Sequence, residues 1–278
     1  MGKTAASVKD EDFVEQLIVA NTHRTLLCFS NLGKVYWLKV YEIPQASRTA
    51  KGRPLVNLIE LDEQERVTSL LDVQSFEDEA FVFMATQNGI IKKTPLSEFK
   101  RPRKNGKRAI KLDENDELVG TLLTNGSADL MVVSNAGKAV FFNEKDARSM
   151  GRDTRGVKGI TLDRNQKVIS LLKPSKESEI LTVSENGYGK RSKVSDFRKT
   201  KRGAKGVIAM QTTQRNGDLI SAKEVSDTDE VILITNKGML VRTKVSEISL
   251  IGRNTQGVKV ITLKEDEALN GLALAIDS

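Results

Sequence analysis

Cysteine and histidine are almost missing from this 278-residue sequence, which has one of each. A single cysteine excludes an intramolecular disulfide and a cysteine-based zinc site, so a metal would need carboxylate ligands almost alone. No apolar run approaches the roughly 20 residues that a membrane helix needs, and the N-terminus lacks a hydrophobic signal core. These absences predict a soluble, intracellular, globular protein.

Acidic residues are also missing from five particular segments, although the chain has 37 of them. Windows 45–56, 99–112, 148–159, 197–207 and 248–260 hold 21 of the 44 lysines and arginines and one acid, Asp153. The net charge of +7 therefore conceals an acidic body that carries five basic segments. Charge segregated in this way indicates contact with a polyanion.

The basic segments recur about every 50 residues, each centred on a glycine. A second family of glycines keeps the same period and follows apolar, β-rich runs such as FVFMATQNGIIKKTPL. Asn88-Gly89 and Asn186-Gly187 are strong hairpin turns, because both residues tolerate positive φ. After each basic loop we expect a short apolar strand (PLVNLIEL, RAIKL, VKGITL, VIAM and VKVITL), a polar turn and a last strand.

Four strands per repeat, five times over and without a convincing amphipathic helix, predict an all-β, propeller-like array. We expect one domain over 1–278, with repeats at approximately 21–75, 76–126, 127–176, 177–226 and 227–278. The period by itself defines the architecture and leaves the family open.

Four of the basic loops share the approximate form Arg-x-x-[Arg/Lys/Gln]-Gly, and the second, KRPRKNGKRAIK, is irregular but the most charged. Glycine lets backbone approach a phosphate, and arginine donates two hydrogen bonds to its oxygens. Such contacts position a duplex without reading its sequence. With only 5% aromatic residues the chain offers few rings for stacking single-strand bases, so the duplex backbone is the better ligand.

The predicted DNA-binding residues all lie in or at the edge of these loops. They are Arg48, Lys51, Arg53, Lys100, Arg101, Arg103, Lys104, Lys107, Arg108, Arg152, Arg155, Lys158, Arg198, Lys199, Lys201, Arg202, Lys205, Arg253 and Lys259.

Catalytic, cofactor and metal residues are not predicted in this chain. The three tyrosines, the candidates for DNA cleavage, lie in or near strands and are expected to pack. The sequence lacks a Gly-x-x-x-x-Gly-Lys-Ser/Thr phosphate loop. Asp227-Thr228-Asp229 has the spacing of a magnesium-binding pair but falls in a linker, where an exposed turn is expected. His23 is expected in a surface turn, Cys28 in a core and Trp37 between blades.

One stretch, FVEQLIVANTHRTLLCFSNLGKVYWLKVYEIPQASRTAKGRPLVNLI, resembles the C-terminal domain of the bacterial DNA gyrase A subunit. VRTKVSEISLIGRNTQGVKVI resembles the last repeat of that domain, so the likeness spans essentially the whole chain. The resemblance implies a β-pinwheel, a propeller-like disc or spiral whose blades exchange strands with their neighbours. It also implies a non-catalytic module that binds, bends and wraps duplex DNA around a basic rim, which gives chirality to ATP-dependent negative supercoiling.

The same resemblance implies partners and a location. The partners would be double-stranded DNA, the rest of the gyrase A subunit and the gyrase B subunit in an A2B2 holoenzyme, without a membrane. ATP and magnesium would act on other parts of that ATP-hydrolysing type II topoisomerase, in the bacterial cytoplasm and nucleoid. We expect the chain to begin just after the family's Arg/Gly-rich box, with residues 1–20 as the remnant of a first blade and lead strand.

Two alternatives remain at this point. The C-terminal domain of topoisomerase IV is a close relative with fewer or degenerate blades. A propeller could also use the same basic rim to bind an acidic protein partner.

Overall fold

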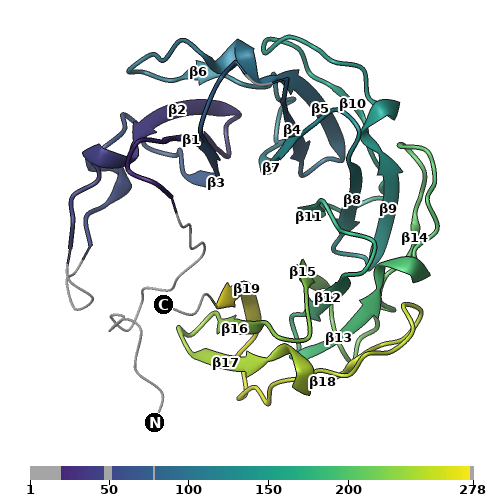
Figure 1. Ribbon diagram of the computed structural model, residues 1–278. Helices are drawn as coiled ribbons and strands as arrows, with labels where there is room; N and C mark the ends of the chain where they lie inside the picture. Colours follow the sequence, from purple (N-terminus) through teal and green to yellow (C-terminus); the bar gives the residue numbers. More distant parts are fainter. Residues whose placement is uncertain (1–19, 47–51, 78, 276–278) are drawn as a thin grey trace.

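Five antiparallel sheets follow one another around a common centre in the computed structural model, which describes residues 20–46, 52–77 and 79–275 (Figure 1). The all-β, propeller-like architecture predicted from the repeat period is therefore confirmed. The expected first-blade remnant, residues 1–20, falls outside the described residues apart from Ala20.

Each blade is built on a hairpin with an inner strand beside it. The hairpins are β1 (Thr25–Ser30) with β2 (Lys34–Lys39), β4 (Phe81–Thr86) with β5 (Ile90–Pro95), β8 (Asp129–Ser134) with β9 (Lys138–Asn143), β12 (Glu179–Ser184) with β13 (Tyr188–Lys193), and β16 (Glu230–Thr235) with β17 (Leu240–Lys244). The inner strands are β3 (Val67–Val73), β7 (Leu118–Thr124), β11 (Val168–Leu172), β15 (Leu219–Val225) and β19 (Leu269–Ala275). They pair with the first strand of the hairpin and lie nearest the centre (Figure 1).

The outer strand of a blade comes from the basic loop of the next repeat. These strands are β6 (Lys107–Arg108), β10 (Val157–Lys158), β14 (Val207–Ile208) and β18 (Val258–Lys259), and they pair with β2, β5, β9 and β13 respectively. Among the described residues the fifth sheet has three strands. Neighbouring blades therefore exchange strands, as the resemblance implied.

Short 3-10 helices connect the hairpins to the loops. They are η1 (Val40–Glu42), η3 (Leu96–Phe99), η4 (Glu144–Asp146), η5 (Val194–Asp196) and η6 (Val245–Glu247). A further one, η2 (Leu55–Asn57), replaces the strand expected at PLVNLIEL, so that expectation is wrong. Pro54, which has no backbone N–H, precedes η2 with extended dihedrals, and Asn57 and Leu58 then donate within the turn rather than to a ladder.

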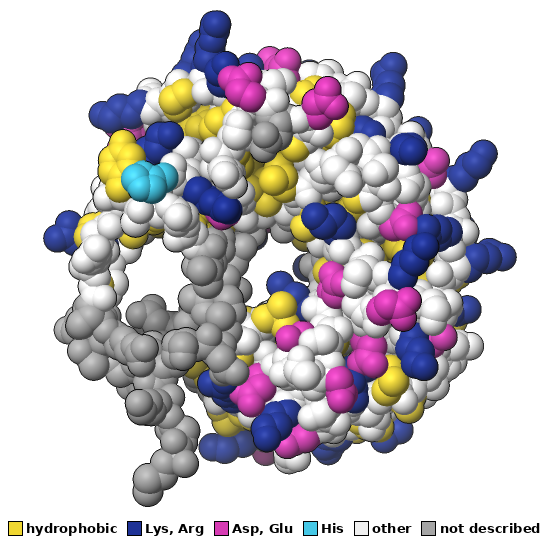
Figure 2. All heavy atoms as spheres, in the orientation of Figure 1, with side chains coloured by type: hydrophobic (Ala, Val, Ile, Leu, Met, Phe, Trp, Pro, Cys, Tyr) yellow, Lys and Arg dark blue, Asp and Glu magenta, His cyan; other side chains and the backbone are white. Residues whose placement is uncertain are grey.

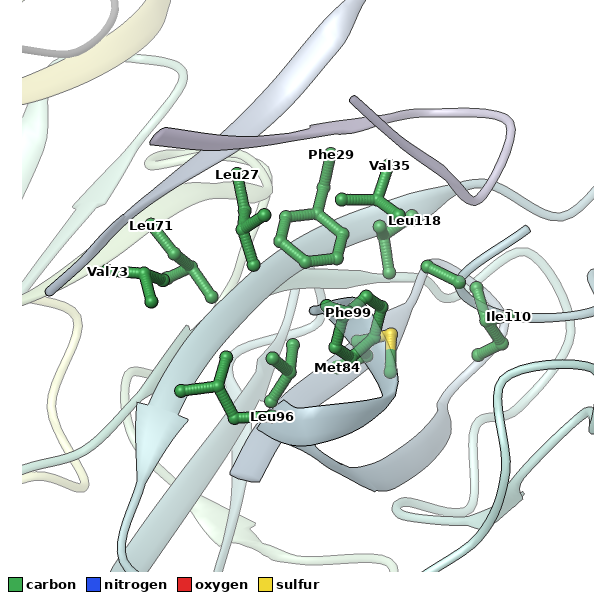
Figure 3. Packing of buried hydrophobic residues seen from close by; sticks show 12 residues of the cluster. Leu27, Phe29, Val35, Leu71, Val73, Met84, Leu96, Phe99, Ile110 and Leu118 are labelled. Carbon is green, nitrogen blue, oxygen red and sulfur yellow. The ribbon is translucent and has the colours of Figure 1, made fainter. Parts of the chain in front are cut away.

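The hydrophobic core lies between consecutive blades. Figure 3 shows Leu27 and Phe29 of the first blade packed against Met84, Leu96 and Phe99 of the second. The other face of the first sheet is covered by the segment around η2, including Leu55, Leu58 and Ile59, so β1 reads as an unbroken buried run, TLLCFS. Covering both faces explains why the first strand of a hairpin, as in β1, β4, β8 and β12, lacks the alternation of a half-exposed sheet, whereas the inner strands β3 and β11 keep it.

Two residues that the sequence singled out belong to this packing. Trp37 is partly buried against the first core and donates its indole N–H to the Phe99 carbonyl at 2.8 Å. Cys28 is fully buried, and burial raises the pKa of its thiol to about 12. Both expectations are confirmed.

The hairpin glycines receive the incoming chain of the next repeat. Ala209 and Met210 both donate their N–H to the carbonyl of Gly137, whose φ is +72°. A Cβ on Gly137 would lie 2.0 Å from the Met210 carbonyl oxygen. The glycine is therefore required by close backbone approach as well as by the turn.

We expect Gly137→Ala to lower the free energy of unfolding by about 2–4 kcal/mol, because backbone must shift and the φ is strained. Gly252→Ala is the matched control, since nothing lies within 4 Å of its Cβ position. Urea unfolding of both variants checks this. Equal stability of the two would contradict the close approach.

Candidate nucleic-acid interface

The basic loops lie on the outer circumference, where they run into the outer strands β6, β10, β14 and β18. Figure 2 shows lysine and arginine side chains projecting outward around this edge. We call the loops 99–112, 148–159, 197–207 and 248–260, with residues 52–56 of the first loop, the rim. Two predicted residues, Arg48 and Lys51, fall outside the described residues.

Most of the predicted DNA-binding side chains are exposed on the rim. These are Arg53, Lys100, Arg101, Arg103, Lys104, Arg108, Arg155, Lys158, Arg198, Lys199, Lys201, Lys205 and Lys259. Four others are half-buried: Lys107, Arg152, Arg202 and Arg253. The structure therefore separates two groups that the charge pattern placed together.

Three of the half-buried residues are equivalent arginines that tie each loop to the outer strand before it. The Nη1 contacts are Arg152 to the Arg108 carbonyl at 3.2 Å, Arg202 to the Lys158 carbonyl at 3.0 Å, and Arg253 to the Ile208 carbonyl at 2.8 Å. Arg202 and Arg253 also donate through Nε to the carbonyls of Asp146 and Asp196. These arginines join the second to the fifth loops of the rim to one another, and part of their donor capacity is already used.

Acidic side chains flank several of the rim cations. The ion pairs are Lys100 with Glu77, Lys104 with Glu60, Arg108 with Asp153, Arg152 with Glu98, Arg155 with Asp113, Lys199 with Asp129, and Lys205 with Asp163. The hydrogen bond from Lys104 to Glu60 raises the pKa of that lysine. Arg101 and Arg103 of the second loop form no ion pair with a described residue, and neither do Arg198 and Lys201 of the fourth.

Two lysines beneath the rim were not among the predicted residues. Lys92 on β5 and Lys190 on β13 are both fully buried. Burial lowers the pKa of Lys92 to about 8 and that of Lys190 to about 7. The basic positions after the turn glycines were visible in the sequence, but their burial was not.

These shifts predict a rise in stability with pH. A lysine whose folded pKa is lowered binds fewer protons in the folded state, so the free energy of unfolding increases as pH rises through the folded pKa toward 10.5. We expect the increase to begin near pH 7, where the Lys190 shift acts, and to steepen near pH 8 as Lys92 adds to it. Denaturant unfolding should show a smaller increase in Lys190→Met, and an equal slope would contradict the assignment.

The remaining candidates are placed as follows. Tyr36 is buried and donates to Glu65 at 2.6 Å, whereas Tyr188 lies under the guanidinium of Arg215. Tyr41, in η1, is 67% exposed, so the expectation that it packs is wrong. Asp227 pairs with Arg191, and Asp229 accepts the N–H of Ser226. These acids serve different partners, and within the described residues no group of three metal-ligating side chains comes together.

His23 is exposed in a turn, as expected, and its backbone N–H donates to the side chain of Asn21. The described segments contain no helix with the length and hydropathy that a membrane span requires.

A ring of strand-exchanging blades with a joined basic rim defines a β-propeller of the pinwheel type. The family model for the DNA gyrase C-terminal domain, beta-propeller, matches residues 24–74, 80–125, 128–175, 178–226 and 229–275. This chain belongs to that family.

Individual relatives agree with the family assignment. The DNA gyrase A subunits of Salmonella typhimurium and Escherichia coli K12 are each 51% identical to it over 271 residues, 98% of this chain and 31% of their own length. The chain thus spans about a third of the curated relatives it matches. Among solved structures, the C-terminal domain of DNA topoisomerase IV superposes with a TM-score of 0.87 at 27% identity, covering 97% of this chain and 84% of that one. The DNA gyrase A C-terminal domain gives 0.79 at 26%, covering 98% and 93%.

Proposed function

We propose that this chain binds the phosphate backbone of duplex DNA along its rim, without sequence specificity, and bends the duplex around the disc. The observation that carries the proposal is the joined rim, in which exposed cations of successive loops are held at one circumference by inter-loop arginine bonds. Lysine and arginine on such a surface release counterions from DNA without reading bases.

Within a whole protein, the proposed role is that of the DNA-wrapping domain of gyrase A. It would act with the rest of that polypeptide and with gyrase B on DNA in the bacterial cytoplasm and nucleoid, and wrapping would give negative supercoiling its handedness. ATP and magnesium would be used by other parts of the holoenzyme. The 51% identity to gyrase A proteins favours this role over that of topoisomerase IV, although the topoisomerase IV domain has the higher TM-score.

A binding titration tests the proposal. Fluorescence anisotropy with a duplex, a single strand of equal length and an acidic polypeptide should show the tightest binding to the duplex. The slope of log K for the duplex against log salt concentration should be negative, with a magnitude of several units. Preference for the acidic polypeptide would instead support a protein partner. Handedness is tested by ligating a nicked plasmid with the protein bound and reading the change in linking number.

The acidic flanks of the rim give a separate prediction. Asp113 pairs with Arg155, so it competes with phosphate for that guanidinium. We expect Asp113→Asn to tighten duplex binding by about two- to fivefold, the range that exposed ion pairs allow. Asp266→Asn, an equal charge change in an exposed turn, is the control. Equal gains in duplex affinity in both variants would show that the change in net charge, and not the release of Arg155, causes the effect.

A further inference from the structure

Two blades carry a lysine where the others carry an uncharged residue. The position is three residues after the turn glycine, on the second hairpin strand. It is Lys92 in the second blade and Lys190 in the fourth, but Tyr36, Val140 and Val241 in the first, third and fifth. The fold therefore accepts an apolar side chain at this site and does not need lysine for packing.

Each lysine holds backbone of the rim, and its three N–H groups are all used. Lys92 Nζ donates to the carbonyls of Ala109 at 2.9 Å, of Thr154 at 3.1 Å and of Arg152. Lys190 Nζ donates to the carbonyls of Arg253 at 2.7 Å and Gly252 at 3.1 Å, and to the Ser192 hydroxyl at 2.9 Å. An ammonium has three donors and no acceptor, so both sites match the charged form.

The carbonyls that the two lysines bind include those of the arginines that join neighbouring rim loops. Arg152 and Arg253 are the arginines whose guanidinium groups reach back to the preceding outer strand. Beside them, Gly151 and Gly252 have no neighbour within 4 Å of a Cβ position, so packing does not hold the backbone there. The lysine bonds replace that missing packing and turn partly negative carbonyl oxygens inward, away from the surface.

The third and fifth loops, whose arginine carbonyls accept from Lys92 and Lys190, contain fewer lysines and arginines than the second and fourth. The third and fifth loops, 148–159 and 248–260, have four and two lysines and arginines, against seven and five in the second and fourth. A loop with few cations depends more on holding each one in place, because ordering a flexible loop on binding costs conformational entropy.

We propose that Lys92 and Lys190 are positioning residues that hold the third and fifth rim loops in the shape that meets DNA, a role that rests on the proposed DNA binding. They touch loop backbone and not the ligand. The fourth loop has five lysines and arginines and no lysine of this kind beneath it, whereas the second loop has seven and shares one Lys92 bond, at the Ala109 carbonyl.

Because these lysines are buried, the hydrogen bonds by which they hold the rim loops depend on pH. A neutral amine keeps two N–H donors and loses one of the three bonds. The charged groups that act on Lys190 are Asp196 and Arg253, and those that act on Lys92 are Asp153, Arg152 and Glu98. Burial is the largest influence on the pKa of both lysines, and it lowers the pKa by favouring the neutral amine. Lys190 therefore loses its charge as pH rises above about 7.

Lys190→Met tests the proposal, with Lys193→Met as the control because Lys193 is exposed on the same strand and carries the same charge. Hydrogen exchange without DNA should be about tenfold faster in 252–257 of Lys190→Met and unchanged in Lys193→Met. Affinity for duplex DNA at pH 6.5 should fall about fivefold in Lys190→Met and less than twofold in the control. At pH 8.5 the difference between wild type and Lys190→Met should narrow.

Unchanged exchange in 252–257, or equal losses of affinity in the two variants, would overturn the proposal. If circular dichroism shows that Lys190→Met does not fold, Lys190→Gln takes its place, because glutamine keeps two N–H donors. Exchange in 252–257 of Lys190→Gln should then increase by less than the tenfold expected for Lys190→Met, and no increase would contradict the role. Failure of the wild type to bind DNA would remove the proposed function, and exchange in 252–257 would still decide whether Lys190 orders the loop.

Discussion

Neutralising the second rim loop is expected to weaken the binding of a duplex longer than about 100 base pairs by about 100-fold near 0.1 M salt, the largest loss for any single loop. The variant replaces Arg101, Arg103, Lys104, Lys107 and Arg108 with glutamine. This loop has seven lysines and arginines and no acid in its window, and two of its arginines have no ion pair with a described residue. Each lost phosphate contact should also lower the slope of log K against log salt by about 0.9.

The control must carry the same change in charge away from the rim. Glutamine at Arg164, Lys167, Lys193, Lys237 and Lys264 removes five exposed cations that lie outside the rim windows. We expect this control to change the salt slope by less than one unit. Similar losses in the two variants, measured by anisotropy across a salt series, would show that net charge rather than the rim governs binding.

Three of the substituted side chains, those of Lys104, Lys107 and Arg108, have contacts within the protein, so the stability of the variant must be checked. Lys107 lies over the Trp37 ring at 5.6 Å, and the Arg108 carbonyl accepts from Arg152. Glutamine leaves that carbonyl in place. It removes the cation–π contact, which contributes about 0.5–1 kcal/mol, and the exposed ion pairs of Lys104 with Glu60 and of Arg108 with Asp153, which contribute little. Thermal unfolding of the variant should therefore stay close to that of the wild type, and the loss of affinity is then assigned to the loop surface.

The repeat period, the hairpins and the basic circumference could all be predicted from the sequence, because each depends on local chemistry. Asn88-Gly89 encodes its turn in two residues, and a loop without acids is visible as a string of letters. Strand exchange followed only from the family resemblance, since a two-residue strand such as Val207–Ile208 has no periodicity to read. Its pairing with β9 depends on the Gly137 carbonyl, some 70 residues earlier.

The sequence could not show which rim cations bind neighbouring backbone and which are exposed, because that depends on which way each side chain points. Arg152 and Arg155 look equivalent in the sequence, yet the first reaches a neighbouring carbonyl and the second is exposed. Lys190 sits in a buried strand, where a charged residue is costly unless its partners are supplied by another segment. Those partners are the carbonyls of 252–253, more than 60 residues further along the chain.

Duplex length should change binding strongly if DNA follows the rim. A duplex of about 20 base pairs can engage only part of the circumference, whereas one longer than about 100 can bend around several loops, at an elastic cost of several kcal/mol that the added contacts must offset. We expect at least a 100-fold gain in affinity from the short to the long duplex, with a steeper salt dependence because more counterions are released.

Longer DNA also offers more overlapping sites, which raises affinity without adding contacts, so the salt slope is the decisive readout. In gel shifts over a series of lengths, the slope should rise and then level off once every available loop is engaged. Neutralising the second loop should lower that final slope while leaving the slope for the shortest duplexes, which can bind elsewhere on the rim, nearly unchanged. A slope independent of length from the shortest duplex onward would mean that DNA touches one loop at a time, and wrapping would be ruled out.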